Sequence, residues 1–411
     1  MPAEKDGSNM ATQAQDMTGA AEEAQGRHEK TPGKVRQLLA DAANARATDI
    51  HVDPVNDGFR IAFRVDGILQ GHGRLGAEDG RHLLNQIKVA AQFTPDRTFK
   101  PLEGRLTRAA EASTPDVRLT LIPTVAGEAA HLRLLETSSD FLQASELGLS
   151  QVDLDSVRRA LRQREGLILI TGPTGSGKTM TLYALASLLD LEHALAASIE
   201  DPVEFDLENV RQIQVDPSHD LTMALGLRTL LRSDPDILLV GEIRDEASAV
   251  TAVRAAASGR FVLATLHARD IPLAVQSCRY YGVPRHLLGN TLQMVVNQDL
   301  VRRLCTQCAR PRKPSDEEKK QFEAMDLAVP DQVFDATGCE ACHAYGYVGR
   351  IGIFDTLPIH DRLRSAIARA ASMDDVRKAF DDRTGGLLGD ALAKAAAGTT
   401  SVREAHRVAR A

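Results

Sequence analysis

The chain has 411 residues, of which 43% are hydrophobic and 26% are charged, a balance typical of a globular protein with two or three domains. Its 49 Lys and Arg against 56 Asp and Glu give a net charge of −7, so no overall basic charge favours binding to nucleic acid or to an anionic membrane. No apolar run approaches the roughly 18 residues of a membrane span, and the N-terminus lacks the apolar core of a signal peptide. These features predict a cytoplasmic protein that reaches a membrane only through partners.

The N-terminal residues 1–32 contain no Val, Ile, Leu, Phe, Tyr, Trp or Cys. Such a segment cannot bury enough apolar surface to offset the entropy lost on ordering, so we predict a disordered tail. Folding is predicted to begin near Val35, where apolar residues recur at helical spacing. Alternating apolar residues over 59–65 then predict a strand bracketed by turns. We expect a small α+β domain over residues 33–135 and a linker over residues 136–150.

The next part of the chain alternates apolar strands with helical segments. Strands are predicted at residues 167–170, 195–199, 237–240 and 261–266. These runs lack polar alternation, which is typical of parallel strands covered by helices on both faces. The pattern therefore predicts an α/β core over residues 151–300.

A glycine-rich octet, Gly-Pro-Thr-Gly-Ser-Gly-Lys-Thr, follows the first of these strands and precedes a helical run predicted over residues 180–191. Its glycines let backbone N–H groups and the helix N-terminus surround phosphates. Lys178 would reach the β- and γ-phosphates, and Thr179 would ligate Mg²⁺. A chance glycine-rich turn is the alternative, but the strand-loop-helix context favours a P-loop in a RecA-like core. The predicted nucleotide-binding residues are Gly172, Pro173, Thr174, Gly175, Ser176, Gly177, Lys178, Thr179 and Met180.

Three further segments end apolar strands of this core with charged or titratable residues, at 199–204, 234–245 and 263–267. In an open parallel sheet, ligands bind beyond the carboxyl ends of the strands, so these residues are expected to meet the P-loop. Phosphoryl transfer to water needs a group that orients the nucleophile, an acid that organises the metal and positive charge at the γ-phosphate. For each segment alone, ordinary surface charge or a hydrogen-bonded histidine is the alternative.

Together these segments resemble the cytoplasmic ATPases that drive type II secretion and type IV pilus assembly. The family's Walker A loop, aspartate box, Walker B segment and histidine box are matched, in order, by GPTGSGKT at 172, SIEDPVEF at 198, DPDILLVGEIRD at 234 and LATLHARD at 263. The resemblance implies that Glu204 is the general base for the attacking water, that Glu242 is the Walker B acid acting on Mg²⁺, and that His267 senses the γ-phosphate. The histidine box departs from the family pattern, because Gly-Arg-Phe stands at 259–261 where Gly-His-Leu is common.

The resemblance extends upstream to the PAS-like domain that precedes the core in this family. It rests on ATDIHVDP at 47–54, FRVDG at 63–67, DVRLT at 116–120 and GEAAHLRLL at 127–135. It implies that Arg118 and Arg133 touch the γ-phosphate when this domain closes on the core, and Arg105 is also expected near the nucleotide. A guanidinium suits this task because it stays charged and its planar fork matches phosphate oxygens. Surface arginines on strands are the alternative. No further docking domain is expected before Val35.

The cysteines form two Cys-x-x-Cys pairs, Cys305 with Cys308 and Cys339 with Cys342, separated by 30 residues. Four thiolates can complete a closed tetrahedral zinc site that stabilises a fold and does no chemistry. Disulfides are the alternative, which a cytoplasmic chain disfavours. Relatives with a tetracysteine subdomain end it as this chain does, with Gly-Tyr-x-Gly-Arg-x-Gly, so such a subdomain is expected over residues 301–355. The remaining Cys278 is expected to be a packed core residue.

The last part of the chain, residues 356–411, is Ala-rich and is expected to form a helical C-terminal subdomain. Ser401 and Glu404 have the spacing of a capping box, which predicts the start of the last helix there.

The resemblance implies a homo-hexameric motor whose ATP hydrolysis moves the PAS-like domain against the core and drives an inner-membrane platform protein, at the inner face of the cytoplasmic membrane. No nucleic acid partner is expected, since only 4% of residues are aromatic and stacking platforms for bases are scarce.

Three alternatives stay open: a pilus-retraction motor, a hexameric nucleic-acid translocase, and a nucleotide-gated scaffold with little hydrolysis. Retraction ATPases of this family generally lack the tetracysteine subdomain, and Glu204 and Glu242 argue against the scaffold. The machine served, whether type II secretion, a type IV pilus or a DNA-uptake pseudopilus, is left open.

Overall fold

The computed structural model describes residues 33–96, 99–106, 116–135, 143–370, 372–380 and 385–409. The chain divides into two compact units, residues 1–137 and 138–411, and each is described by itself. The predicted tail at 1–32 and residues 136–142 of the predicted linker lie outside the described residues. Within the described ranges, no helix is both long enough and apolar enough to cross a membrane.

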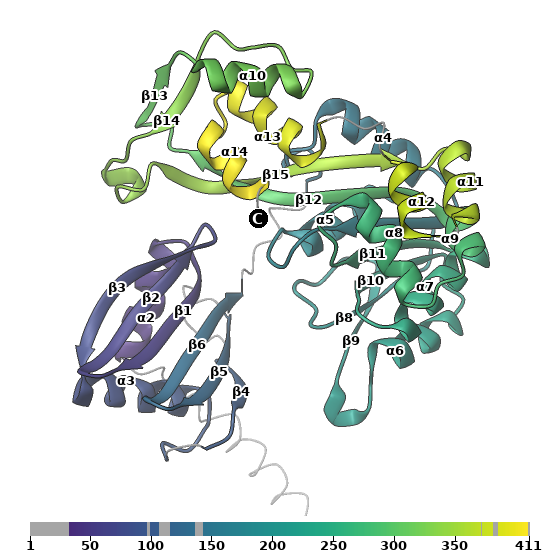
Figure 1. Ribbon diagram of the computed structural model, residues 1–411. Helices are drawn as coiled ribbons and strands as arrows, with labels where there is room; N and C mark the ends of the chain where they lie inside the picture. Colours follow the sequence, from purple (N-terminus) through teal and green to yellow (C-terminus); the bar gives the residue numbers. More distant parts are fainter. Residues whose placement is uncertain are drawn as a thin grey trace, which may run out of the picture. The chain divides into compact units, whose positions relative to one another are not determined.

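The first unit is a six-stranded antiparallel sheet in the order β3-β2-β1-β6-β5-β4, with two helices packed on it (Figure 1). Its elements are α2 (Gly33–Asn44), β1 (Ala47–Val55), β2 (Gly58–Val65), β3 (Ile68–Gly76), α3 (Ala77–Ala90), β4 (Leu102–Leu106), β5 (Asp116–Thr124) and β6 (Gly127–Leu135).

Among the described residues, the helices of this unit pack on one face of its sheet. Along β5, the buried Val117, Leu119 and Leu121 alternate with more exposed residues such as Arg118. The three apolar residues belong to one core that also contains the buried residues of α2 and α3. Because successive side chains of a strand point to opposite faces, Arg118 lies on the face without helices.

The second unit contains a seven-stranded sheet in the order β15-β12-β7-β11-β10-β8-β9. All neighbours are parallel except β12 and β15, so the α/β core that the sequence predicts is present. The first elements are α4 (Gln151–Leu161), β7 (Gly166–Thr171), α5 (Lys178–Ala186), β8 (Ala196–Glu200), β9 (Val210–Gln214), α6 (Met223–Leu231), β10 (Ile237–Ile243), α7 (Glu246–Ala257), β11 (Phe261–Leu266), α8 (Ile271–Tyr280) and α9 (Arg285–Thr291). They are followed by β12 (Leu292–Leu304), β13 (Ala309–Arg312), α10 (Asp316–Ala324), β14 (Val333–Ala336), β15 (Tyr347–Pro358), α11 (Asp361–Arg369), α12 (Met373–Lys378), α13 (Gly386–Ala396) and α14 (Val402–Ala409).

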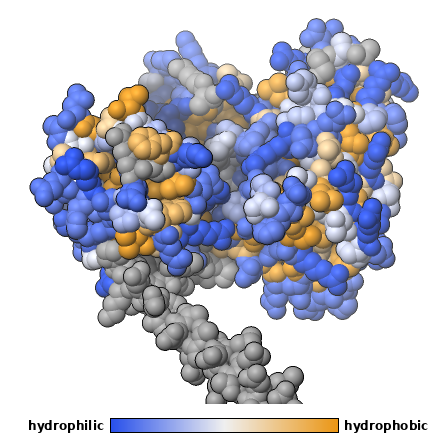
Figure 2. Space-filling view, turned by 90° about the horizontal axis from the view of Figure 1, so that it is seen from below, coloured by the Kyte–Doolittle hydropathy of each residue, from blue (hydrophilic) through white to orange (hydrophobic). Residues whose placement is uncertain are grey.

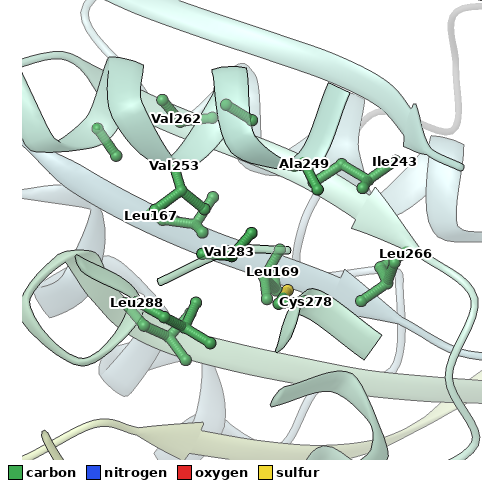
Figure 3. Packing of buried hydrophobic residues seen from close by; sticks show 14 of the residues in the cluster. Leu167, Leu169, Ile243, Ala249, Val253, Val262, Leu266, Cys278, Val283 and Leu288 are labelled. Atoms are coloured by element: carbon green, nitrogen blue, oxygen red, sulfur yellow. The ribbon is translucent and has the colours of Figure 1, made fainter. Parts of the chain in front are cut away.

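Strand β7 is buried throughout, and it is apolar over residues 167–170 because both faces of this sheet are covered. Leu167 and Leu169 enter the core formed with α7, α8 and α9, where Figure 3 shows them beside side chains of these helices. Ile168 and Ile170 enter the opposite core, which α4 and α5 complete. Two helical layers thus hold the central strands rigidly, and their carboxyl ends carry the loops described below.

Helix α5 ends at Ala186, so the prediction of a helix to residue 191 was wrong. The Oγ of Ser187 donates to the carbonyl oxygen of Ala184 at 2.9 Å, and the N–H groups of Leu188 and Leu189 bond three residues back. The Ser187 hydroxyl competes for a helix carbonyl and so ends the regular helical hydrogen bonding. The apolar residues continue at helical spacing beyond it, which is why the sequence predicted a longer helix.

The tetracysteine segment is an insertion between neighbouring strands of the main sheet. It contains β13, α10 and β14, and the flanking strands β12 and β15 pair antiparallel along most of their length. The boundaries predicted after residues 300 and 355 lie within β12 and β15, so they divide both strands. Pairing between strands so far apart in sequence leaves no local signal.

The last helix, α14, begins as predicted with the Oγ of Ser401, which accepts a hydrogen bond from the N–H of Glu404 at 3.1 Å. The carboxylate of Glu404 accepts hydrogen bonds from the guanidinium groups of Arg302 and Arg407. The glutamate of this cap therefore ties α14 to β12.

Exposed apolar side chains are scattered over the surface. Among the described residues they include Val125 between β5 and β6, Val152 on α4 and Tyr280 on α8. On the face in Figure 2, hydrophilic residues predominate and hydrophobic ones form small separate groups. Scattered exposure of this kind is ordinary for globular proteins.

Candidate nucleotide site and tetracysteine centre

The loop between β7 and α5 has a backbone that glycine favours. Gly175 and Gly177 have φ of 78° and 84°, in the left-handed region. At Gly172, a Cβ would lie 2.2 Å from the backbone oxygen of Gln298, so no larger residue fits. Helix α5 begins directly after Gly177, which brings its N-terminal N–H groups and the positive end of its dipole to the loop. Thr179, the predicted Mg²⁺ ligand, is half-buried in the first turn of this helix.

The loop also fits a phosphate chemically. The Oγ of Ser176 is buried and has no hydrogen-bond partner among the described residues. Buried hydroxyl groups are normally paired, so this one calls for an acceptor such as a phosphate oxygen. Behind the loop, the side chain of Gln298 donates to the carbonyl oxygen of Ser176 at 2.6 Å. The loop is therefore braced from behind by β12.

Strand β12 contributes a second buried polar residue to this support. The Oδ1 of Asn297 accepts from the Oγ1 of Thr171 at 3.1 Å, and its Nδ2 donates to the carbonyl oxygen of Arg269 at 2.9 Å. Asn297 and Gln298 were not predicted as site residues. Their signal in the sequence is two consecutive amides directly after the apolar run at 294–296, and amides are unfavourable to bury without partners.

Lys178 lies in a polar cluster at the carboxyl ends of the strands. Its Nζ donates to the carbonyl oxygens of Gly172 at 3.1 Å and Pro173 at 2.9 Å, and it lies 3.3 Å from the Nδ1 of His267. Burial lowers the pKa of Lys178, while the nearby carboxylate of Glu242 opposes this shift. The ammonium group is thus held inside the loop by acceptors that phosphate oxygens can replace.

Glu242 lies at the centre of a chain of contacts that runs from the aspartate box to the P-loop lysine. Its carboxylate lies against the imidazole of His267 and makes a close ion pair with the guanidinium of Arg244. The Nη1 of Arg244 also donates to the Oδ2 of Asp201 at 2.7 Å. The structure therefore brings the predicted residues Lys178, Glu242 and His267 together. Arg244 was not predicted, although its position two residues after Glu242 near a strand end places both on one face.

Glu200, the last residue of β8, and Glu204, in the loop that follows, have different surroundings. Glu204 is exposed, and its backbone N–H donates to the hydroxyl of Tyr183 at 3.3 Å. Glu200 is 1% exposed, and its carboxylate accepts from Ser198 at 2.6 Å, from Gln212 at 3.1 Å and from the hydroxyl of Tyr183. A carboxylate enclosed by donors cannot take a proton from solvent water, whereas an exposed one can.

In the first unit, Arg105, Arg118 and Arg133 lie directly opposite one another on β4, β5 and β6. Arg133 is opposite Asp49, whose carboxylate accepts from its Nε at 3.0 Å. Although burial opposes ionisation, hydrogen bonds from His131 and Arg133 hold the pKa of Asp49 far below its usual range. Like charges directly across a sheet disfavour each other, so this row of arginines suits an anion.

The four predicted cysteine ligands meet at one point. The Sγ atoms of Cys305 and Cys339 are 3.8 Å apart, those of Cys308 and Cys342 are 3.7 Å apart, and all four lie within 4.8 Å of one another. These separations exclude disulfides, whose sulfurs are about 2.05 Å apart. They match the spacing of about 3.8 Å between thiolates bound tetrahedrally at about 2.3 Å to zinc. The cluster could therefore hold zinc.

The surroundings of Cys342 favour a thiolate. Its Sγ accepts hydrogen bonds from the N–H groups of Cys339 and Gly346, each at 3.1 Å. Although burial opposes ionisation, these donors lower the pKa of Cys342 to about 7. Cys278 differs, because it is packed in the apolar core shown in Figure 3 and burial raises its pKa to about 12.

Comparison with known proteins agrees with these motifs. The family described as Type II/IV secretion system protein matches residues 25–407. The type II secretion system protein E of Aeromonas hydrophila is 36% identical over 92% of this chain and 75% of its own length. The type II secretion system ATPase E of Vibrio cholerae is also 36% identical, over 91% of this chain and 74% of its own. The type IV pilus assembly ATPase PilB of Acinetobacter baylyi is 35% identical, over 91% and 65%.

Solved structures share the fold. The Legionella pneumophila ATPase DotB has a TM-score of 0.64 at 19% identity and covers 93% of this chain with 96% of its own. The pilus retraction motor PilT with bound ADP has a TM-score of 0.59 at 21% identity, over 90% and 96%. These likenesses confirm the predicted fold class, and the sequence relatives confirm the predicted family. The chain belongs to the Type II/IV secretion system protein family and is an ATPase of that family.

Proposed function

We propose that this chain hydrolyses ATP to power type II secretion or type IV pilus assembly. The observation that carries this proposal is the contact of Lys178 with His267, and of His267 with Glu242, beside a glycine loop that fits phosphates. These three side chains come from three separate motifs, and they lie beside the buried Ser176 hydroxyl, which has no hydrogen-bond partner among the described residues. Packing alone does not require titratable groups to gather at such a place.

The residues of the core take distinct roles in this proposal. The loop N–H groups and Lys178 hold the β- and γ-phosphates, and Thr179 and Glu242 hold Mg²⁺, directly or through water. Mg²⁺ neutralises the charge that develops on the transferred phosphoryl group. The exposed carboxylate of Glu204 takes the proton of the attacking water. His267, between Lys178 and Glu242, responds to the γ-phosphate.

The arginines of the first unit complete the site when the two units close. Arg118 and Arg133 bind the γ-phosphate, and Arg105 extends the same row. Guanidinium groups on one strand face can offer several forked donors to one anion. Catalysis then requires both units of a subunit to close. In a homo-hexamer, the closing of one subunit can move its neighbours, so the rate of hydrolysis depends on the assembled ring.

The tetracysteine cluster holds one Zn²⁺ in this proposal. All four positions around the metal are then filled by Cys305, Cys308, Cys339 and Cys342, so the ion stabilises the insertion and takes no part in hydrolysis. The cluster also favours assembly over retraction, since it marks the assembly branch of the family.

The partners follow from the family. The motor acts on an inner-membrane platform protein from the cytoplasmic side, and its membrane association comes through such partners. No nucleic acid partner is proposed. A nucleotide-gated scaffold with little hydrolysis is the alternative that an activity measurement distinguishes.

The test is Glu204→Gln in the full chain, with Asp206→Asn as a matched control in the same loop. Losing a positioned general base typically slows turnover by about 10²- to 10⁴-fold. We expect a loss in this range in kcat with ATP still bound, and wild-type turnover for the control, in which another exposed acid of this loop becomes an amide. In a strain that lacks the chain, the wild type and Asp206→Asn should restore secretion or surface pili, and Glu204→Gln should not. Normal secretion and piliation with Glu204→Gln, or equal loss in both variants, would contradict the proposal.

A further inference from the structure

The loop that carries Glu204 is held in place by side chains from outside the loop. The hydroxyl of Tyr183 accepts from the N–H of Glu204 at 3.3 Å. The amide of Gln212 donates to the carbonyl oxygen of Phe205 at 3.0 Å and accepts from the N–H of Leu207 at 2.7 Å. The segment has no regular secondary structure, so these bonds replace a strand or helix in fixing its backbone.

Both anchors also bind the buried carboxylate of Glu200, which is 1% exposed. The hydroxyl of Tyr183 and the Nε2 of Gln212 donate to it, and the Oγ of Ser198 donates at 2.6 Å. A carboxylate only accepts hydrogen bonds, so Glu200 determines how both anchors are oriented. The single proton of the Tyr183 hydroxyl points to Glu200, which leaves an oxygen lone pair for the N–H of Glu204. The Nε2 of Gln212 also faces Glu200, so the Oε1 of Gln212 is free to accept the hydrogen bond from the N–H of Leu207.

Tyr183 also connects this loop to the phosphate loop. It lies on α5, the helix that begins at Lys178, and it is fully buried. Its ring packs edge-on against Phe205 with centroids 6.2 Å apart. Burial, and then the carboxylate of Glu200, raise the pKa of Tyr183, so the phenol keeps its proton at neutral pH. One rigid helix therefore positions both Lys178 and the backbone of Glu204.

We infer that Tyr183 and Glu200 are positioning residues for ATP hydrolysis. Glu200 orients the Tyr183 hydroxyl, and that hydroxyl fixes the backbone of Glu204 at a set distance from the phosphate loop. This inference rests on the proposed role of Glu204 as the general base. Because a displacement of about 1 Å in a catalytic group can cost about 10²-fold in rate, loosening this anchor should affect turnover more than nucleotide binding.

The first experiment compares Tyr183→Phe with Tyr347→Phe in the full chain. The second substitution also removes a hydroxyl from a buried tyrosine, which bonds Ser401 at 2.7 Å and not the Glu204 loop. For Tyr183→Phe we expect kcat to fall about tenfold or more, with ATP affinity changed less than about twofold. Tyr347→Phe should show a similar decrease in melting temperature and an unchanged kcat. A wild-type kcat in Tyr183→Phe, or equal losses of kcat in both variants, would overturn the inference.

A double-variant cycle tests whether Tyr183 acts through Glu204. If it does, Tyr183→Phe should slow the wild type but not Glu204→Gln, because the group being positioned is already absent. A further slowing by the same factor would overturn the inference while leaving the base assignment intact. Wild-type turnover of Glu204→Gln would instead overturn the base assignment and the inference with it.

A second variant keeps the test decisive if Tyr183→Phe folds poorly. Glu200→Gln is nearly isosteric but presents an amide N–H₂ group to donors, so one anchor must lose its partner. We expect a lower kcat with ATP affinity kept, and no additional loss when it is combined with Glu204→Gln. An unchanged kcat in Glu200→Gln would count against the positioning role.

Discussion

Lys178 has a role that its neighbours define. It is 8% exposed, and the groups around its ammonium are the carbonyl oxygens of Gly172 and Pro173 and the imidazole of His267. Burial lowers its pKa, so the charged form depends on acceptors at close range. A phosphate oxygen is a stronger acceptor than a carbonyl oxygen, and this difference can move the amine from the loop to the nucleotide.

Replacing this lysine should remove activity without unfolding the chain. For Lys178→Ala we expect kcat/KM to fall at least about 10²-fold, since the change removes a preorganised cation from the phosphate site. Lys313→Ala, an exposed lysine outside the cluster, should behave as wild type. Steady-state ATPase rates, ATP affinity and melting temperature should be measured together. Wild-type turnover in Lys178→Ala would contradict the assignment of the nucleotide site.

At the scale of elements, β12 connects distant parts of the second unit. Gln298 braces the phosphate loop, Arg302 pairs with Glu404 of α14, and Cys305 of the tetracysteine cluster follows the strand directly. The pair of Arg302 and Glu404 is largely buried, with side chains 16% and 1% exposed. Removing one partner of such a pair leaves a buried charge uncompensated, which is strongly destabilising.

The same pair predicts how stability depends on pH. Although burial opposes ionisation, the guanidinium groups of Arg407 and Arg302 lower the pKa of Glu404 to about 2. A depressed carboxyl pKa contributes stability that is fully present above the ordinary glutamate pKa, about 4.3, and is lost as pH falls toward 2. Glu404→Gln should lower the free energy of unfolding by about 2 kcal/mol at pH 7, less than for a fully buried pair because Arg407 is half-exposed.

Chemical denaturation at several pH values checks this prediction. The difference from wild type should shrink as pH falls from about 4 toward 2, because the unfolded chain binds a proton at Glu404 before the folded chain does. Asp316→Asn breaks an exposed pair with Lys319 in the same unit and should leave stability unchanged. A difference for Glu404→Gln that does not depend on pH would show that the cost is packing and not charge.

The tetracysteine insertion should depend on metal. Metal analysis of the purified chain should find about one zinc per chain, and Cys339→Ser should lose it. Structural zinc contributes on the order of 10 to 16 kcal/mol of apparent binding free energy, so the insertion should become protease-sensitive. Cys278→Ala removes a core thiol and should keep the zinc. Zinc-free wild-type protein with an intact insertion would reject the site.

At the scale of the whole molecule, the proposed function assigns residues of both units to ATP hydrolysis. The core supplies the phosphate loop and the acids, and the sheet of the first unit supplies Arg105, Arg118 and Arg133 in one row. Arginine fingers are worth about 10³ to 10⁵ in turnover, so separated units should be nearly silent. Assembly can then control activity without any change in the phosphate loop.

Arg133→Ala tests this division. In the full chain it should bind ATP but lose about 10³-fold in kcat. Arg60→Ala is the matched control, because Arg60 is also a half-exposed strand arginine of this sheet paired with an aspartate, Asp53 at 3.1 Å, outside the row. Wild-type specific activity should rise with protein concentration as rings form, and this rise should be absent in Arg133→Ala. Equal turnover in both variants would make Arg133 an ordinary surface residue.

Much of this protein could be predicted from local sequence. The apolar runs that become β7, β8, β10 and β11 predicted a parallel sheet, because strands buried on both faces need no polar alternation. The octet at 172–179 predicted the phosphate loop, since glycine adopts the positive φ of Gly175 and Gly177 without steric cost. The cysteine spacing likewise predicted a four-sulfur cluster. The catalytic roles of Glu204, Glu242 and His267 are still predictions.

Contacts between segments far apart in the chain were decided only by the tertiary structure. The sequence could not show that Gln298 braces Ser176, that Arg244 bridges Glu242 and Asp201, or that Glu200 is enclosed while Glu204 is exposed. Local patterns report which face of a helix or strand is buried, because that depends on a period of a few residues. Which side chains meet at the ends of different strands depends on the order and register of the sheet, and these follow from long-range packing that no local pattern records.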